Sequence, residues 1–219
     1  MRFETADIGP ELTKFNDEIS TAIIYQIVGE ISEKDIIEIN NINTKTNKIK
    51  NRFKKIEERG FAIKFDRFYS EMLEANLRII DSKMPEILSE LVFYYYSGNG
   101  SRICELIKMI KNKNPLNITP SYGSNFYEIK IKSFLMAVAL GMNPHEKWNG
   151  NFDSSVGYRI LKENGESINF NIYREDELQD YLLNNTRFDS SNNNNKMYSM
   201  IYKEGEDSFL SLNFQIKLT

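Results

Sequence analysis

The stretch KMYSMIYKEGEDSFLSLNFQIKL, residues 196–218, closes the chain and decides its fold class. Two runs rich in apolar residues flank Gly205, where the chain can turn back on itself. Alternating runs around a short turn are typical of a β-hairpin. The earlier stretch VGYRILKENGESINFNIY, residues 156–173, repeats the pattern around Asn164-Gly165, a strong hairpin signal. The sequence therefore predicts two antiparallel hairpins in its last third.

A short helix is expected between these hairpins, in REDELQDYLLNN at residues 174–185, with acids in its first turn. The last third thus predicts a ββαββ unit, a small antiparallel sheet with a helix on one face. Upstream of it, apolar residues recur at helical spacing, although residues 22–28 could instead be a strand. The helical stretches are residues 15–29, 32–42, 46–60, 66–81, 84–96, 102–111 and 125–141.

The predicted fold class is therefore α+β, with a mainly helical N-terminal two thirds followed by the ββαββ unit. We expect a helical region at residues 1–141 and the sheet unit at 142–219, packed as one globular body. The chain has 219 residues, of which 41% are hydrophobic, enough for a sizeable core. No run is long and apolar enough for a membrane helix, and the start has no signal-peptide core, so a cytoplasmic protein is expected.

The chain contains one cysteine and one histidine, and these low numbers exclude several kinds of site. Cys104 is the only cysteine, so no intrachain disulfide and no cysteine-based zinc site can form. His145 is the only histidine, which argues against a multi-histidine metal site. The net charge of −3 argues against a strong non-specific coat on nucleic acid, but a local basic face can still bind it.

An acid-x-lysine pair, Glu128 and Lys130, occurs in YEIKIK at residues 127–132. In metal-dependent nucleases such a pair helps to hold Mg²⁺ and to orient the attacking water. The motif usually lies on a strand, whereas this segment has helical spacing. The alternative is a surface ion pair between Glu128 and Lys132, four residues apart on a helix.

Three further stretches each allow two interpretations. In NPHEKWNGNFD, residues 143–153, His145 beside carboxylates is either a base or a loop residue with a local hydrogen bond, and Trp148 is expected to anchor the junction. KIKNRFKK, residues 48–55, is either a phosphate-binding helix face or an ordinary solvated one. In residues 184–202, four asparagines between Arg187 and Lys196 could read base edges, or could form a mobile linker.

Several segments together resemble the C-terminal portion of the HpaII-type restriction endonucleases. The resemblance is collinear over most of residues 9–219, and its longest part runs from YLLNNTRF to LNFQIKL. The segments that carry it are GPELTKFNDEISTAIIYQI (9–27), NLRIIDSKMPEIL (76–88), YEIKIK (127–132), FLMAVALGMNPHEKWNG (134–150), Gly157-Tyr158, YLLNNTRFDSS (181–191) and IYKEGEDSFLSLNFQIKL (201–218).

The resemblance implies a type II site-specific deoxyribonuclease that cleaves double-stranded DNA at CCGG, uses Mg²⁺ and is blocked by cytosine methylation. Members of the family carry Ser/Thr residues followed by a basic pair near this place. The resemblance therefore makes DNA-contact candidates of the corresponding residues of this chain. These are Arg187, Ser190, Ser191, Asn195 and Lys196, with Glu128 and Lys130 as catalytic candidates. RFETADIG, residues 2–9, contains no lysine, so the chain is expected to be truncated before the family's catalytic strand.

Three alternatives remain open at this point. The chain could be a catalytically inactive DNA-recognition remnant, or one subunit of a split enzyme. It could also be a non-enzymatic, protein-binding helical module. The expected partners are double-stranded DNA and either a second copy of the chain or a complementary nuclease subunit.

Overall fold

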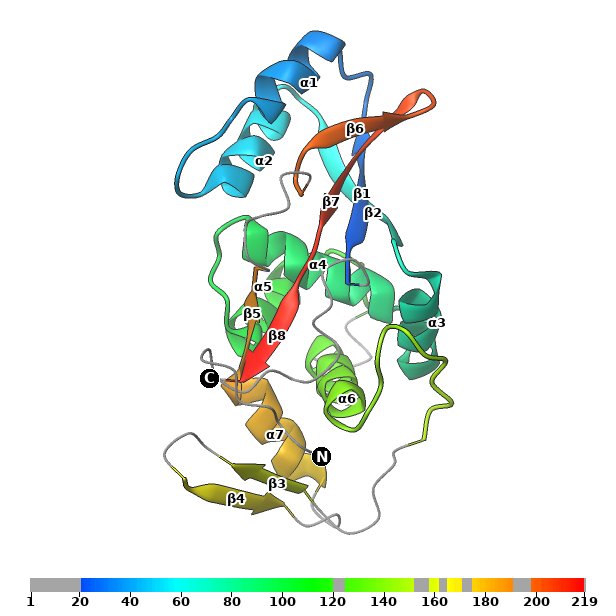
Figure 1. Ribbon diagram of the computed structural model, residues 1–219, viewed down its shortest axis with the longest axis vertical. Coiled ribbons are helices and arrows are strands. Elements are labelled where there is room, and N and C mark those ends of the chain that lie inside the picture. The colour runs from blue at the N-terminus through cyan, green and yellow to red at the C-terminus, as the bar shows by residue number, and fades with distance from the viewer. Residues whose placement is uncertain are drawn as a thin grey trace.

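The computed structural model describes residues 21–119, 125–151, 158–161, 165–170, 175–190 and 198–218 (Figure 1). Its helices are α1 (Glu33–Asn40), α2 (Lys48–Glu58), α3 (Glu71–Ile80), α4 (Met84–Tyr96), α5 (Ile103–Lys113), α6 (Phe126–Ala139) and α7 (Glu175–Asn185). Its strands are β1 (Ile23–Val28), β2 (Ala62–Phe68), β3 (Tyr158–Leu161), β4 (Ser167–Phe170), β5 (Thr186–Asp189), β6 (Ile201–Glu204), β7 (Asp207–Leu212) and β8 (Gln215–Leu218).

A four-stranded antiparallel sheet joins the two ends of the described chain, in the order β2-β1-β7-β6. Tyr25 at the centre of β1 faces Phe65 of β2 on one side and Leu210 of β7 on the other. The helix predicted for residues 15–29 is therefore wrong in its described part, and the strand alternative for residues 22–28 is confirmed. The apolar run is a strand because it is buried on both faces, as Ile23 and Ile24 together illustrate.

The second departure from the predicted helices is β2. The helix predicted for residues 66–81 is wrong at its beginning, where Asp66 to Phe68 complete β2. Helix α3 begins only at Glu71, after Ser70, whose side chain accepts a hydrogen bond from the Leu73 N–H. A hydroxyl there satisfies one of the free N–H groups of the first turn. The remaining predicted helices are present within a few residues of their expected bounds.

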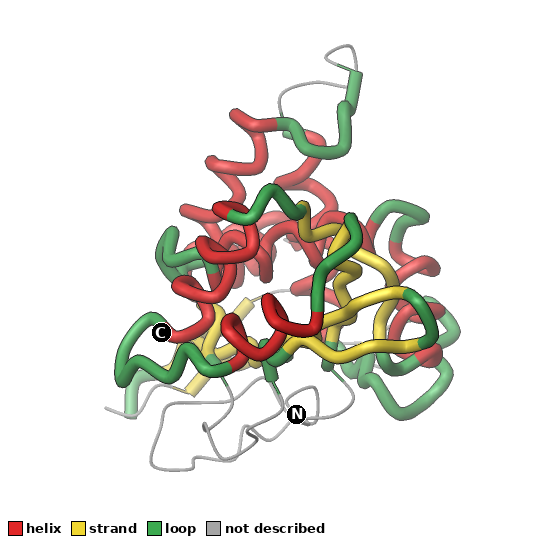
Figure 2. Tube along the Cα trace, turned by 90° about the horizontal axis from the view of Figure 1, so that it is seen from above, coloured by secondary structure: helices red, strands yellow, loops and turns green. Residues whose placement is uncertain are grey.

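Helix α4 forms the centre of the core. Its apolar residues Ile87, Leu88, Leu91 and Val92 are fully buried, and it contacts α3, α5, α6 and β2. Figure 1 shows α1, α2 and β6 at one end of the molecule, α4 and α5 in the middle, and α7 with β3 and β4 at the other end. Seen from above, helices lie on more than one side of the strands (Figure 2). No described helix is long and apolar enough to cross a membrane.

The C-terminal third contains the two predicted hairpins, β3–β4 and β6–β7, and the helix α7 between them. The α+β class and the antiparallel pairing are confirmed. The described strands do not form one small sheet, however: β3 pairs with β4, β5 pairs with β8, and β7 joins β1. One edge of β7 pairs with β1 from the N-terminal part of the chain, a long-range pairing that local sequence patterns do not reveal.

Candidate nucleic-acid interface

Strand β5 carries the described members of the predicted DNA-contact set. It follows α7 without a loop, and Thr186 is tied to that helix because its hydroxyl donates to the Leu182 carbonyl at 2.7 Å. Phe188 is buried against the rings of Tyr95 and Phe214, at centroid distances of 5.8 and 5.6 Å. Since side chains alternate along a strand, Arg187 lies on the opposite face from Phe188 and is half-buried.

Three basic residues face one another across neighbouring extended segments at this point. Arg187 lies opposite Lys217 of β8 in the β5–β8 register, and an isolated antiparallel bridge places Arg102 opposite Arg187 on the other side. The Lys217 side chain is only 6% exposed, and its Nζ lies 3.1 Å from Oδ2 of Asp189. The exposed Arg102 donates through Nη2 to the Asn184 carbonyl in the last turn of α7, at 3.0 Å.

Two tyrosines of α4 close the inner side of this region. Burial raises the pKa of Tyr95, while hydrogen bonds with Ser190 and the charge of Arg187 act to lower it. Burial also raises the pKa of Tyr96, whose hydroxyl donates to the Asn213 carbonyl at 2.6 Å. Both hydroxyls therefore stay protonated at neutral pH, and Ser190 is held close to the charged face of β5. The candidates Ser191, Asn195 and Lys196 lie outside the described residues.

The basic stretch at residues 48–55 contains one residue that fits neither of its two interpretations. Arg52 of α2 is 4% exposed. Its Nη2 donates to the Asn40 carbonyl at 2.7 Å and its Nη1 to the Ser199 hydroxyl at 2.8 Å. Burial lowers the pKa of Arg52, and its Nε has no hydrogen-bond partner among the described residues. Arg52 thus joins α1 and α2 to the segment that leads into β6.

The other cations of the same helix match the solvated-face interpretation. Lys54 lies 3.6 Å from Glu58, one turn along α2, and Lys55 lies 2.9 Å from Glu38 of α1. Asn40 adds a further tie to the start of β6, because its side-chain amide donates to the Ile201 carbonyl and its Oδ1 accepts from the Ile201 N–H. The start of β6 is therefore held by side chains from two helices.

The acid-x-lysine pair lies on α6, and its two members have separate partners. Glu128 lies 3.1 Å from Lys132, the helical i+4 pair expected from the sequence, and 3.5 Å from Lys111. Lys130 lies 2.7 Å from Asp81 and over the Phe126 ring. The structure pairs each of them with an oppositely charged side chain. It places them on a helix rather than on a nuclease strand.

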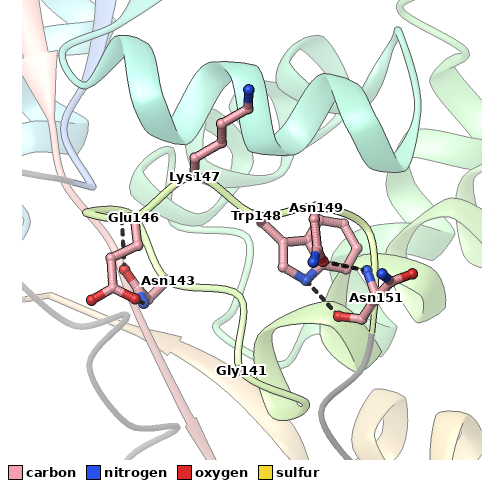
Figure 3. A pocket seen from close by; sticks show the side chains of 7 residues that line it. All are labelled: Gly141, Asn143, Glu146, Lys147, Trp148, Asn149 and Asn151. Atoms are coloured by element: carbon pink, nitrogen blue, oxygen red, sulfur yellow. Dashed lines mark hydrogen bonds between the residues drawn. The ribbon is translucent and has the colours of Figure 1, made fainter.

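Residues 141–151 form a polar loop that is held by hydrogen bonds and lines a small pocket of about 140 Å³ (Figure 3). Asn76 of α3 is fully buried and holds the loop: its amide donates to the Asn143 and Glu146 carbonyls, and its Oδ1 accepts from the Trp148 N–H. Trp148 packs against the core, as expected of a junction anchor. His145 is exposed, its backbone N–H donates to Asn143, and Asp153 lies outside the described residues.

A magnesium site would need several oxygen ligands at one place. Within the described ranges, no group of three or more His, Cys, Asp or Glu side chains is arranged to hold a metal ion. The carboxylate of Glu128 is occupied by two lysines. The described residues therefore do not fit a magnesium centre.

Sequence reasoning missed Arg102, Lys217, Tyr95 and Arg52. The sequence does contain one indication of the role of Lys217. This lysine lies between apolar residues in QIKL, and a lysine in a buried strand needs a partner for its charge. The sequence contains no such indication for Arg102 and Tyr95, because their positions depend on how distant segments pair. Arg52 was hidden among neighbouring lysines that are ordinary surface residues.

Comparison with known proteins now adds to this geometry. A family model described as HpaII restriction endonuclease matches residues 5–218. The chain is 35% identical over 212 residues to the type II restriction enzyme HpaII of Haemophilus parainfluenzae, an alignment that covers 97% of this chain. The chain spans 58% of the length of that relative. No solved structure matches it.

Proposed function

Because this chain belongs to the HpaII restriction endonuclease family, we propose that it binds double-stranded DNA at a short CCGG-type site and takes part in cleaving it. The observation that carries the proposal is the family match over residues 5–218. The basic face of β5 supports it physically, since neutralising phosphate charge supplies much of the affinity of proteins for DNA.

We propose Arg187 and Ser190 as DNA contacts among the described residues. An arginine can bond to a phosphate or bidentately to a guanine edge, and a serine hydroxyl can bond to either a base or a phosphate. Ser191, Asn195 and Lys196 complete the proposed set by resemblance alone. The Arg187 guanidinium supports this role because Asp189, the acid on the same strand face, is taken by Lys217.

Glu128 and Lys130 stay the proposed catalytic pair, and Mg²⁺ enters the proposal from the family resemblance. The described residues offer no ligand set for the metal, so no step of the reaction is assigned to them through it. The variant Glu128→Ala tests the pair. Loss of cleavage with an unchanged circular dichroism spectrum would support the catalytic role, whereas unchanged cleavage would remove Glu128 from the proposal.

A plasmid cleavage assay tests the function as a whole. The purified chain is incubated with CCGG-containing plasmid, unmethylated or methylated at cytosine, in Mg²⁺ or in EDTA. We expect nicking or linearisation of the unmethylated plasmid in Mg²⁺ only. Binding to a CCGG duplex and to a scrambled duplex of equal length is measured at low salt in parallel. If the chain binds neither duplex, the proposal fails and a protein-binding module is favoured.

A non-cleaving recognition protein, or one subunit of a split enzyme, is the second candidate. One observation favours it: Glu128 and Lys130 lie on helix α6, where each forms an ion pair with a neighbouring side chain, instead of on a strand. This candidate predicts site-specific binding without nicking under any metal condition. Addition of a complementary subunit, or dimerisation of the chain on DNA, would then be needed for cleavage, and sedimentation of the complex reports its stoichiometry.

A further inference from the structure

We infer that Arg102 and Arg187 bind the sugar-phosphate backbone of DNA, and that Lys217 keeps Arg187 available by occupying the carboxylate of Asp189. The inference rests on the proposed function and deepens it. It adds Arg102 as a phosphate contact, and Lys217 as a positioning residue that does not touch DNA. We call Lys217, Arg187 and Arg102 the basic row.

The register of the strands places the basic row on one face. Lys217 and Arg187 are directly opposite in the β5–β8 pair, and Arg187 and Arg102 are opposite in the adjoining bridge. Directly opposed residues of antiparallel segments have Cβ atoms about 4.5–5.5 Å apart. A backbone hydrogen bond forms this bridge, because the Phe188 N–H donates to the Ser101 carbonyl at 2.8 Å.

Like charges placed directly opposite one another destabilise a strand pair. Here three cations share one face with the single carboxylate of Asp189, which lies 3.1 Å from Lys217. Among the described residues, no acidic side chain lies within ion-pair distance of Arg187 or Arg102. Counted over the described residues, the row therefore carries net positive charge, which an anion such as a phosphodiester would neutralise. Exposure increases along it, from buried Lys217 through half-buried Arg187 to exposed Arg102.

Asp189 decides whether Arg187 is available. Side chains two residues apart on a strand share a face, so the Asp189 carboxylate could pair with Arg187 if Lys217 did not hold it. Lys217 is 5% exposed, too buried to reach a DNA phosphate itself. Its proposed role is consequently to direct Asp189 away from Arg187.

Arg102 also makes a structural contact, since its guanidinium donates to a carbonyl in the last turn of α7. A cation is favourable at the C-terminal end of a helix. That role predicts a change in stability when Arg102 is replaced but no change in the salt dependence of DNA binding. The two roles can therefore be separated experimentally.

The test measures the dissociation constant for a CCGG duplex and a scrambled duplex over a range of salt concentrations. Each phosphate contact contributes about 0.9 to the slope of log K against log salt concentration. We expect Arg102→Gln and Arg187→Gln each to reduce the slope by about 0.9, and Arg102→Lys to preserve it. The control Lys34→Gln lies on α1, which Figure 1 shows well away from β5, and should leave the slope unchanged.

Two further variants test Lys217. We expect Lys217→Met to reduce the slope as Arg187→Gln does, because Asp189 then pairs with Arg187. The double variant Lys217→Met/Asp189→Asn removes both charges and should restore the wild-type slope. If wild-type protein binds DNA but the two glutamine variants keep its slope, the inference is overturned and the proposed function stands. If wild-type protein binds no duplex, both are overturned.

Discussion

Arg52 is a buried cation whose bonds to described residues all go to uncharged oxygens: the carbonyls of Asn40 and Tyr198 and the hydroxyl of Ser199. A buried guanidinium depends on such bonds, because a hydrogen bond in which one group is charged contributes about 1.5–3 kcal/mol to stability. Lysine cannot reproduce the planar fork that reaches two segments at once.

We therefore expect Arg52→Lys to lower the free energy of unfolding by about 2–4 kcal/mol, since at least one charged bond is lost from a buried site. Urea denaturation followed by circular dichroism measures the change. The matched control is Lys54→Gln on the exposed face of the same helix, which should stay within about 0.5 kcal/mol of the wild type. An equal effect of the two substitutions would show that Arg52 does not hold β6 to α1 and α2.

Glu90 of α4 is a half-buried carboxyl close to several tyrosines. Burial raises the pKa of Glu90, and Lys113 opposes this to a smaller extent. The charge of Glu90 in turn raises the pKa of Tyr25 and Tyr94, after burial itself. A carboxyl with a raised pKa in the folded state stabilises the fold at low pH, and this contribution is lost as the pH rises through the folded-state value.

The variant Glu90→Gln should accordingly be more stable than the wild type at pH 8, with the difference disappearing below the unfolded-state pKa of about 4.3. Urea midpoints at pH 4, 6 and 8 measure it. The exposed Glu57→Gln on α2 is the control for a general change in net charge. A glutamine variant that is less stable at every pH would mean that the ionised Glu90 has a stabilising role that outweighs its burial.

At the scale of elements, most helices could be predicted, whereas β1 was predicted only as an alternative to a helix and β2 was not predicted. Helix α1 follows Ser32 and α2 ends before Gly60. These bounds could be predicted because helix caps and apolar periodicity are signals within a single segment. Strand β1 is buried on both faces, so its residues show no alternation. Strand β2 contains a bulge opposite Ile24 and Tyr25, which breaks its alternation and leaves Phe65 and Phe68 at a helix-like spacing of three.

The loop at residues 141–151 is an element whose shape depends on one side chain from elsewhere. Asn76 makes three hydrogen bonds to its backbone, each with a net value of about 0.5–1.5 kcal/mol. We expect Asn76→Ala to lower the free energy of unfolding by roughly 1.5–4.5 kcal/mol, the sum of those three bonds. Trp148, the only tryptophan, should also change its fluorescence in the folded state.

The matched control for this loop is Asn112→Ala, at an exposed position of α5. It should leave both the stability and the fluorescence of Trp148 nearly unchanged. If Asn76→Ala changed the stability but not the fluorescence, Asn76 would be part of the core without shaping the loop. If neither quantity changed, the three hydrogen bonds would not contribute to the folded state.

At the scale of the whole molecule, the candidate interface is assembled from segments that are far apart in the sequence. Arg187 was predicted as a DNA contact because it lies in a polar stretch next to a recognisable helix. Arg102 and Lys217 come from about 85 residues before it and 30 after it, and only the bridge and the β5–β8 pair bring them together. Periodicity reports the structure of one segment at a time, so it cannot predict such pairings.

The same long-range pairing bears on the division of the chain into residues 1–141 and 142–219. Strand β1 belongs to the first part and β7 to the second, yet they are neighbours in one sheet. Leu210 and Leu212 of β7 are fully buried, and Ile23 and Tyr25 of β1 are buried beside them. Removing β7 would expose this apolar surface and leave β1 as an open edge, which favours aggregation.

We therefore expect a fragment of residues 1–141 to show no cooperative thermal or urea unfolding transition, although it retains helical circular dichroism. The intact chain, measured under the same conditions, should unfold in a single transition. Mixing or co-expressing the fragment with residues 142–219 should restore the transition, because β7 then regains its place beside β1. A cooperative transition of residues 1–141 alone would show instead that the helical region is an independent domain, and that the β1–β7 pairing is dispensable for its stability.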